Sequence, residues 1–344
     1  MRWAARRRLR VLGAMALVAA VGGGLYGMMS APDTAVATGL LRGVTTGFLI
    51  TVPLTLFEMY YVDMHRGEAF RRLAFGWMLA AKTLVYLVVI LIGLDIGRRL
   101  FTAGTAPPAI DRESLTNVGF SLAFAAVVNF VMQIRRVLGQ GVLGSFILGR
   151  YHRPREETRV FLFLDLVGST ALAERIGGPR FLELLNRLYM HITEPIAEHG
   201  GEIHKYVGDE VIVTWRGARG FADADCVRCV FAIEDQLRAL AGFYQRRFGH
   251  VPRFRGAIHV GPVVSGEIGD VKQEIAFLGD GMNVTARLVD VCRERDRACV
   301  VSAAALERLS LPAGVAADPL GAVPLRGKSE ALPVFALRRA AAAP

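Results

Sequence analysis

The chain has 344 residues, of which 53% are hydrophobic and 21% charged, and its formal net charge at pH 7 is +10. Its mean hydropathy of +0.37 is too high for an ordinary soluble protein, and its charged fraction is too high for a chain that lies wholly in a membrane. Much of the positive charge is arginine at the N-terminus and beside apolar segments, where it is typical of membrane topology. We therefore expect no nucleic-acid partner.

Four segments near the N-terminus are long and apolar enough to span a lipid bilayer, at 11–29, 40–62, 74–96 and 115–134. Arginines precede the first segment, separate the second from the third and follow the fourth, so the positive-inside rule places both termini in the cytoplasm. The sequence predicts a multi-pass plasma (inner) membrane protein with a four-span α-helical domain over 1–136 and a cytoplasmic C-terminal half. In an alternative interpretation residues 1–30 are a cleaved signal peptide, which leaves the later topology unchanged.

Glu58 and Lys82 are charged residues within or near these spans, where charge is unfavourable. Glu58 lies near the cytoplasmic end of its segment, which favours an interfacial position. Lys82 lies deeper, so we expect it to snorkel to the interface or to pair with Glu58.

The second half of the chain has the alternating pattern of a mixed α/β domain. A glycine-punctuated stretch and a charged run make 137–157 a cytoplasmic connector, residues 158–338 form one domain, and 339–344 is a tail. The expected strands are 160–164, 202–207, 211–215, 254–260, 263–268 and 298–301, with a final hairpin from 325–328 to 333–337. The expected helices are 170–176, 179–199, 221–248 and 280–292. This order predicts an α+β, ferredoxin-like sheet with helices on one side.

The four cysteines all follow residue 220. Cys226 and Cys229 form a C-x-x-C pair, but no second pair stands at zinc-finger spacing. We expect free thiols, buried or half-buried, in a reducing cytosol.

Two aspartates stand at the tips of strand-like apolar runs. Asp165 ends Val160-Phe161-Leu162-Phe163-Leu164-Asp165, and Asp209 follows Gly208 in the tight turn between two strands. Carboxylates delivered in this way hold a hard cation such as Mg²⁺, which is usually bound by one or two carboxylates together with phosphate oxygens. The pair therefore indicates a site for divalent ions on a polyphosphate.

The segment after Asp165 adds an anion-binding turn. Residues 166–170 read Leu-Val-Gly-Ser-Thr and open a helix, where free backbone N–H groups favour an anion. Asp165 alone would also suit a strand-end residue that caps a helix, but the second aspartate disfavours that alternative.

Three further polar residues have spacings that suit substrate contacts. Lys205 precedes Asp209 by four residues on a strand. Asn283 and Arg287 are four apart on a predicted helix, so they share one face. Alone, such a helical pair would be ordinary solvated surface.

The motifs FLDLVGST, HKYVGD and FLGDGMNVTAR together resemble the class III adenylate/guanylate cyclase catalytic domain in order and spacing, over roughly residues 155–338. The resemblance implies that Asp165 and Asp209 hold two Mg²⁺ or Mn²⁺ ions, with the Leu166 backbone carbonyl as an added ligand. The other roles it implies are Lys205 for the purine, Asn283 for the ribose, Arg287 for the α-phosphate, Val167, Gly168, Ser169 and Thr170 for the triphosphate, and, as weaker candidates, Lys272 and Lys328.

The same resemblance implies a homodimer whose metal residues come from one subunit and whose purine and transition-state residues come from the other. The sequence departs from the family pattern at one position. The residue seven before Asn283 is usually a polar residue that recognises the purine, but here it is Ala276. Lys205 still favours adenine, so we expect an adenylate cyclase that converts ATP to cyclic AMP. The alternatives are a guanylate cyclase and an inactive, nucleotide-binding membrane receptor with a cyclase-like half.

Overall fold

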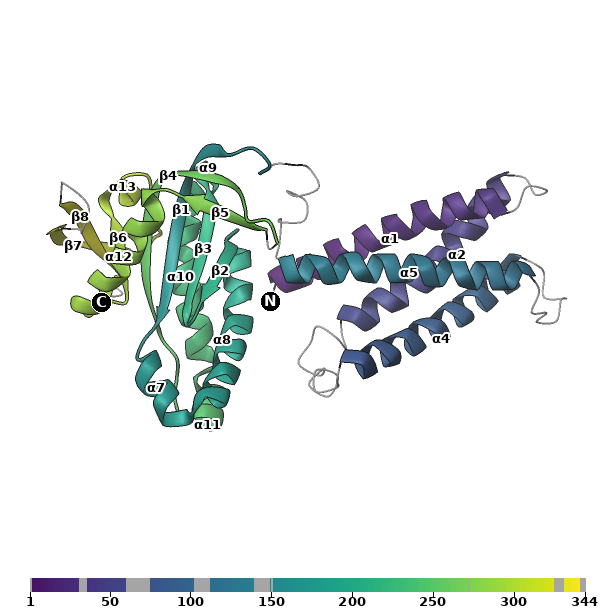
Figure 1. Ribbon diagram of the computed structural model, residues 1–344, viewed down its shortest axis with the longest axis horizontal. Coiled ribbons are helices and arrows are strands. Elements are labelled where there is room, and N and C mark those ends of the chain that lie inside the picture. Colours follow the sequence, from purple (N-terminus) through teal and green to yellow (C-terminus); the bar gives the residue numbers. More distant parts are fainter. Residues whose placement is uncertain are drawn as a thin grey trace. The chain divides into compact units, whose positions relative to one another are not determined.

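The computed structural model describes residues 2–30, 36–59, 75–101, 112–138, 149, 151–271, 273–324 and 331–340. The chain divides into two compact units, Met1–Val137 and Leu138–Pro344. Figure 1 shows the first unit as helices only and the second as a sheet with helices packed against it.

The described helices of the N-terminal unit are α1 (Arg2–Ser30), α2 (Val36–Phe57), α4 (Phe75–Phe101) and α5 (Arg112–Leu138). Helices α1 and α2 approach so closely that a Cβ atom on Gly43 would collide with the carbonyl oxygen of Gly23. Helix α5 joins α1 through the Tyr26 hydroxyl, which donates to the Asn117 side-chain oxygen at 2.7 Å. Glycine therefore allows the close backbone contact that holds the first two helices together.

Among the described residues, two helical segments are long and apolar enough to cross a membrane, Leu9–Met29 and Val36–Phe57. A shorter apolar helix covers Leu115–Val128. Length and composition of this kind are weak evidence, and they do not confirm the predicted four spans. Residues 60–62 and 74 of the predicted second and third spans lie outside the described residues.

Glu58 and Lys82 form an ion pair in the N-terminal unit. The Lys82 Nζ atom lies 2.7 Å from the Glu58 Oε1 atom, and the Lys82 side chain is buried. Tyr86, one turn further along α4, donates its hydroxyl to the same carboxylate at 2.5 Å. Pairing with Glu58, one of the two outcomes expected for Lys82, is thus the observed one, and it joins α4 to the end of α2.

The C-terminal unit is built on one mixed sheet. The strands run in the order β2-β3-β1-β4-β6-β8-β7, with β5 paired to β4. Their bounds are β1 Arg155–Leu166, β2 Glu202–Val207, β3 Glu210–Arg216, β4 Phe254–Ile268, β5 Glu274–Leu278, β6 Cys299–Ser302, β7 Val315–Val323 and β8 Leu332–Arg339. The helices are α7 Ser169–Ile176, α8 Gly178–Glu198, α9 Gly217–Phe221, the 3₁₀ turn η3 Ala222–Ala224, α10 Asp225–Ala239, α11 Ala241–Phe248, α12 Asp280–Glu294 and α13 Ala303–Leu306.

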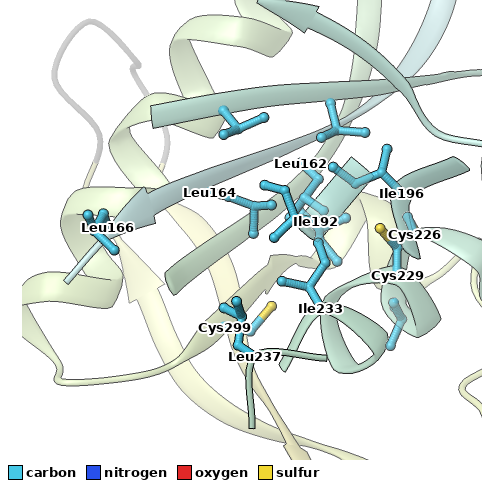
Figure 2. Packing of buried hydrophobic residues seen from close by; sticks show 14 of the residues in the cluster. Leu162, Leu164, Leu166, Ile192, Ile196, Cys226, Cys229, Ile233, Leu237 and Cys299 are labelled. Atoms are coloured by element: carbon cyan, nitrogen blue, oxygen red, sulfur yellow. The ribbon is translucent and has the colours of Figure 1, made fainter. Parts of the chain in front are cut away.

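Alternate residues of β1 enter two different cores. Leu162 and Leu164 pack with α8 and α10 in the larger core, part of which Figure 2 shows. Phe161 and Phe163 pack with α12 in the smaller core. The expectation of helices on one side of the sheet is therefore wrong, because β1 is apolar on both faces and each face requires its own helical cover.

The structure also corrects several predicted elements. The strands expected at 254–260 and 263–268 are one strand, β4, and the helix expected at 221–248 is divided among α9, η3, α10 and α11. Pro262 lies between the stretches of β4 that pair with β6 and with β5, so its missing N–H interrupts neither ladder. Strands β5 and β7 were not predicted. Strand β8 confirms the second arm of the final hairpin, whereas the expected first arm, 325–328, lies outside the described residues.

The cysteines behave as expected from their spacing. All four are free and buried. Cys226 and Cys229 lie in the larger core (Figure 2), where burial raises the pKa of the Cys226 thiol to about 12. They are packing residues.

Candidate functional site

The two predicted metal-binding aspartates lie at neighbouring strand ends. Asp165 is the penultimate residue of β1, where it stands opposite Glu210, the first residue of β3. Asp209 lies in the turn between β2 and β3, directly after Gly208, whose φ of +62° belongs to the left-handed region that favours glycine. The sheet register thus places both carboxylates at the same end of two paired strands.

Two carboxyl groups at this end of the sheet, those of Asp165 and Glu210, have raised pKa values. Burial and the neighbouring charge of Asp209 raise the pKa of Asp165, and a hydrogen bond from Arg293 opposes that rise. Burial, with Asp165 and Asp209, raises the pKa of Glu210 to about 7. Glu210 was missed from the sequence, although its place directly after Asp209 was the available signal. Such a concentration of acidic groups suits a bound cation.

The donor set fits Mg²⁺ or Mn²⁺ on a nucleotide. Within the described part of the chain, no group of three or more His, Cys, Asp or Glu side chains is arranged to hold a metal ion. In the predicted site the two aspartates would hold the ions together with phosphate oxygens, as is usual for Mg²⁺.

The turn after Asp165 has the backbone geometry of an anion site. Gly168 adopts φ +70° and is followed at once by the first turn of α7, whose N–H groups have no partner within the helix. The Val167 N–H donates to the Arg253 carbonyl oxygen at 2.9 Å, so it is already engaged. Gly168, Ser169 and Thr170 are the amide donors that remain for a phosphate. The Leu166 side chain is buried in the larger core, which anchors the turn to the sheet.

One arginine of α12 contacts Asp165, a predicted metal-binding residue. The Arg293 guanidinium donates to the Asp165 Oδ2 atom at 3.3 Å and to the Asp290 Oδ1 atom at 3.1 Å. Sequence reasoning missed Arg293, because nothing local relates it to a residue 128 positions away.

Asn283 and Arg287 lie on another side of α12. Residues of this helix that face the sheet, such as Val284 and Leu288, are buried, whereas Asn283 is exposed and Arg287 half-buried. Arg287 and Arg293 are six residues apart, so they are separated by about 9 Å along the helix and about 120° around it. Arg287 therefore points away from the side of α12 that contacts Asp165 of the same chain.

Lys205 lies beside the strand that carries Ala276. Its Nζ atom is 3.0 Å from the Glu274 Oε2 atom, which places the end of its side chain at β5. His204 confirms this proximity, because its ring centroid lies 4.6 Å from that of Phe277, also in β5. The described contacts thus bring the predicted residues together in two groups, Asp165 with Asp209 and Lys205 with β5.

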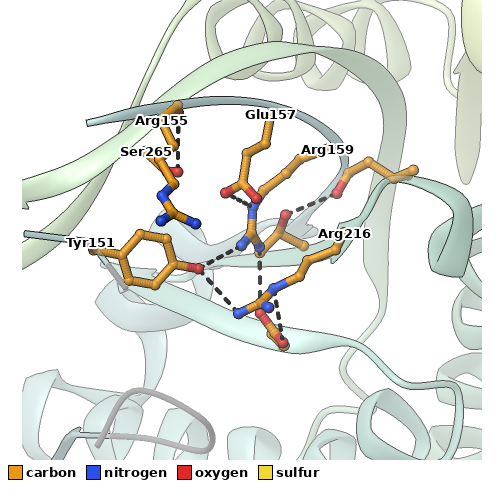
Figure 3. Close-up of polar contacts among 9 residues, drawn as sticks. Tyr151, Arg155, Glu157, Arg159, Arg216 and Ser265 are labelled. Carbon is orange, nitrogen blue, oxygen red and sulfur yellow. Dashed lines mark hydrogen bonds and ion pairs between the residues drawn. The ribbon is translucent and has the colours of Figure 1, made fainter. Parts of the chain in front are cut away.

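A buried arginine packs against Phe277 of β5. The Arg159 guanidinium lies 4.3 Å from the centre of the Phe277 ring and receives further support from Glu157 and from the Tyr151 hydroxyl, which also accepts from Arg216. Figure 3 shows these polar groups converging on Tyr151 and Arg159. Burial alone would raise the pKa of Glu157, but the hydrogen bond and charge of Arg159 lower it.

Two predicted triphosphate contacts cannot be placed. Lys272 and Lys328 lie outside the described residues. Their contacts with the triphosphate stay predictions.

Comparisons with known proteins show the family of the chain. Residues 151–338 match the family model described as the adenylate and guanylate cyclase catalytic domain. Adenylate cyclase 2 of Rhizobium meliloti (strain 1021) is 37% identical over 308 residues, which are 87% of this chain and 84% of that protein. Adenylate cyclase 1 of the same organism is 26% identical over 230 residues, 64% of this chain and 33% of that protein.

A solved structure resembles the chain in its fold. The structure of a bacterial light-regulated adenylyl cyclase aligns with a TM-score of 0.54 at 22% identity, covering 63% of this chain and 64% of that one. The 308-residue match to Adenylate cyclase 2 is longer than residues 151–338, so that similarity reaches into the N-terminal unit.

Proposed function

Because the chain belongs to the adenylate and guanylate cyclase catalytic domain family and is a nucleotidyl cyclase, we propose that it converts ATP to 3′,5′-cyclic AMP and pyrophosphate. One observation carries the proposal. Asp165 and Asp209 stand at adjacent strand ends, and the first of them leads directly into the left-handed Gly168 turn and the start of α7. Carboxylates can bind cations, and backbone amides beside them can bind phosphate, so this arrangement suits a metal-bound nucleoside triphosphate.

In this proposal Asp165, Asp209 and the Leu166 carbonyl hold two Mg²⁺ or Mn²⁺ ions. When bound, these ions neutralise phosphate charge and make the ribose 3′-hydroxyl easier to deprotonate. The amides of Gly168, Ser169 and Thr170 bind the triphosphate. The remaining contacts come from Lys205 to the purine, Asn283 to the ribose and Arg287 to the charge that develops on the α-phosphate.

The composite, dimeric site is part of the same proposal. Arg287 points away from Asp165 of its own chain, so an arginine at this position would serve the aspartates of a second copy. Exposed apolar side chains on β2 and on the β4–β5 hairpin supply a surface for that copy, and they are Tyr206, Val207, Val264, Ile268, Val271 and Leu278. Val264 and Leu278 are cross-strand partners, and the His204–Phe277 contact places β2 beside β5, so these side chains form one region.

Anchoring in the plasma (inner) membrane through several spans, with a cytoplasmic catalytic domain, completes the proposal. The two apolar segments Leu9–Met29 and Val36–Phe57 support it. The arginine distribution supports a cytoplasmic position for both termini.

Adenine is proposed over guanine on two grounds. Lys205 is a cation that can donate to a ring nitrogen, and the 37%-identical relative bears the name adenylate cyclase. A guanylate cyclase is the second candidate, favoured by the absence of an acceptor on the Ala276 side chain.

The full chain in membrane vesicles, supplied with ATP or GTP and Mn²⁺, tests the reaction. We expect cyclic AMP and pyrophosphate from the wild type, and a loss of product from Asp165→Asn but not from Glu183→Gln, an exposed carboxyl that pairs with Arg247. Cyclic GMP as the product would overturn the base assignment. No cyclic nucleotide at all would overturn the enzyme proposal in favour of a nucleotide-binding receptor.

Mixed subunits test the composite site. Asp165→Asn and Arg287→Ala should each be inactive or nearly so, with Arg287→Ala lowering turnover by about 10²–10³-fold. Co-expression of the two variants should restore part of the activity, because one interface would then keep both intact halves. Verified mixed dimers without activity would contradict sharing of the site.

A further inference from the structure

The purine pocket of the proposed site lacks one hydrogen-bonding partner. Adenine presents its ring nitrogen N1, an acceptor, beside its 6-amino group, a donor. Lys205 provides a donor, but the Ala276 side chain has no acceptor. An amino group that is removed from water without an acceptor is unfavourable, so another group at this place would strengthen binding.

Strand β5 supplies such a group. Glu274 lies two residues before Ala276 in the same strand, and side chains two apart in a strand share a face. Both positions pair with β4 in regular register, Glu274 with Ile268 and Ala276 with Gly266. The Glu274 carboxylate is therefore a neighbour of the position where an acceptor is missing.

The contact with Lys205 fixes where this carboxylate lies. The Glu274 Oε2 and Lys205 Nζ atoms are 3.0 Å apart, so an acceptor and a donor stand side by side. The side chains are 36% and 50% exposed, which leaves both groups accessible to a ligand. Strand β2 has a register shift between Ile203 and Lys205, and irregularities of this kind re-aim side chains.

We propose that Glu274 is a specificity-determining residue, whose carboxylate accepts a hydrogen bond from the 6-amino group of adenine while Lys205 donates to N1. The inference rests on the proposed function and deepens it. A side-by-side ammonium and carboxylate match the adjacent acceptor and donor of the adenine edge. Glu274 thus takes the place of the polar side chain that position 276 lacks.

A surface ion pair with no role in binding makes a different prediction. Exposed pairs contribute little to stability, and removing one would affect every substrate alike. A carboxylate that contacts the amino group affects only substrates that carry this group. A substrate without the amino group therefore separates the two.

The test compares ATP with purine riboside triphosphate, which lacks the 6-amino group, using the full chain in membrane vesicles. Glu274→Ala should lower kcat/KM for ATP by about 10- to 100-fold, since hydrogen bonds to charged groups have this strength, and mostly through KM. With purine riboside triphosphate the same variant should match the wild type within about twofold. Glu274→Gln keeps an oxygen acceptor, so its kcat/KM for ATP should lie between the values of Glu274→Ala and the wild type.

Two further variants complete the design. Glu274→Ala combined with Ala276→Asp should regain activity on ATP, because the acceptor returns two residues away. Glu183→Ala, which removes the carboxylate of the exposed Glu183–Arg247 pair, should leave kcat/KM unchanged for both substrates.

The possible outcomes are distinct. Equal losses on both substrates, or no loss on ATP in an otherwise active enzyme, would overturn the role of Glu274 and leave the proposed function intact. A wild type that forms only cyclic GMP, or no cyclic nucleotide, would overturn the proposed function and the adenine contact with it.

Discussion

The fully buried guanidinium of Arg159 lies over the ring of Phe277, its central carbon 4.3 Å from the ring centre. This contact links β1, in the middle of the sheet, to β5, the strand that carries Ala276 and Glu274. The Phe277 ring also contacts His204 of β2. The part of the proposed site that would bind the purine is therefore packed against a buried cation.

Loss of this cation should destabilise the C-terminal unit. Arg159→Ala removes the buried cation that pairs with the Glu157 carboxylate and donates to the Tyr151 hydroxyl, and breaking a buried ion pair lowers stability by about 3–5 kcal/mol. We expect the thermal unfolding midpoint of the unit to fall by about 10 °C. Arg238→Ala, which breaks only exposed pairs with Glu234 and Asp235, should change it by less than about 2 °C. Equal midpoints for Arg159→Ala and wild type would contradict the proposed support.

Arg293 should compete with the metal ions for Asp165. Its guanidinium donates to the Asp165 carboxylate at 3.3 Å, and a cation must displace or share this contact. Because the arginine is largely exposed, the pair is modest, and Arg293→Ala should lower the half-saturating Mg²⁺ concentration by about 2- to 5-fold. Activity measured against Mg²⁺ concentration gives this value. Arg295→Ala, an exposed neighbour, is the control, and a higher metal requirement in Arg293→Ala would refute the competition.

His204 should make the folded protein less stable in mild acid. Burial, with the charges of Lys205 and Arg159, lowers its pKa from 6.5 to about 4, although Glu274 acts in the opposite direction. Between pH 6.5 and pH 4 His204 is protonated in the unfolded chain but not in the folded chain. The free energy of unfolding therefore decreases as the pH falls from 6.5 towards 4. The loss is about 2 kcal/mol at pH 5, because each pH unit corresponds to about 1.4 kcal/mol.

The measurement is the thermal unfolding midpoint of wild type and His204→Gln at pH 7.5 and pH 5. Other groups titrate in both proteins, so the difference between the two declines isolates His204. We expect the wild type to lose more. Parallel declines would show that His204 is protonated equally in the folded and unfolded chain.

The contact between α1 and α2 should tolerate no side chain at Gly43. A Cβ there meets the Gly23 carbonyl, which is backbone and cannot move aside alone. Gly43→Val should therefore separate the two helices and lower the thermal stability of the full chain in detergent. Gly13→Ala in α1, where nothing lies within 4 Å of an added Cβ, should leave it unchanged. Wild-type stability in Gly43→Val would mean that α1 and α2 do not pack through this face.

Local patterns in the sequence predicted the two aspartates, the glycine turns beside them and the helices that follow. Asp165 could be found because it ends an apolar run of strand length, and Asp209 because it lies in a tight turn between two predicted strands. Gly168 and Gly208 could be found because a tight turn with positive φ needs a residue without a Cβ. Periodicity likewise gave the helix that carries Asn283 and Arg287.

The pairing of distant residues was decided by the tertiary structure. Lys205 meets Glu274 across 69 positions, and Arg293 meets Asp165 across 128. The short strand β5 pairs with the end of the long strand β4. Helices cover both faces of the sheet because alternate side chains of β1 are buried in two different cores. A sequence specifies local conformation through steric and periodic preferences, whereas contacts between remote side chains depend on sheet register and packing, which no local pattern contains.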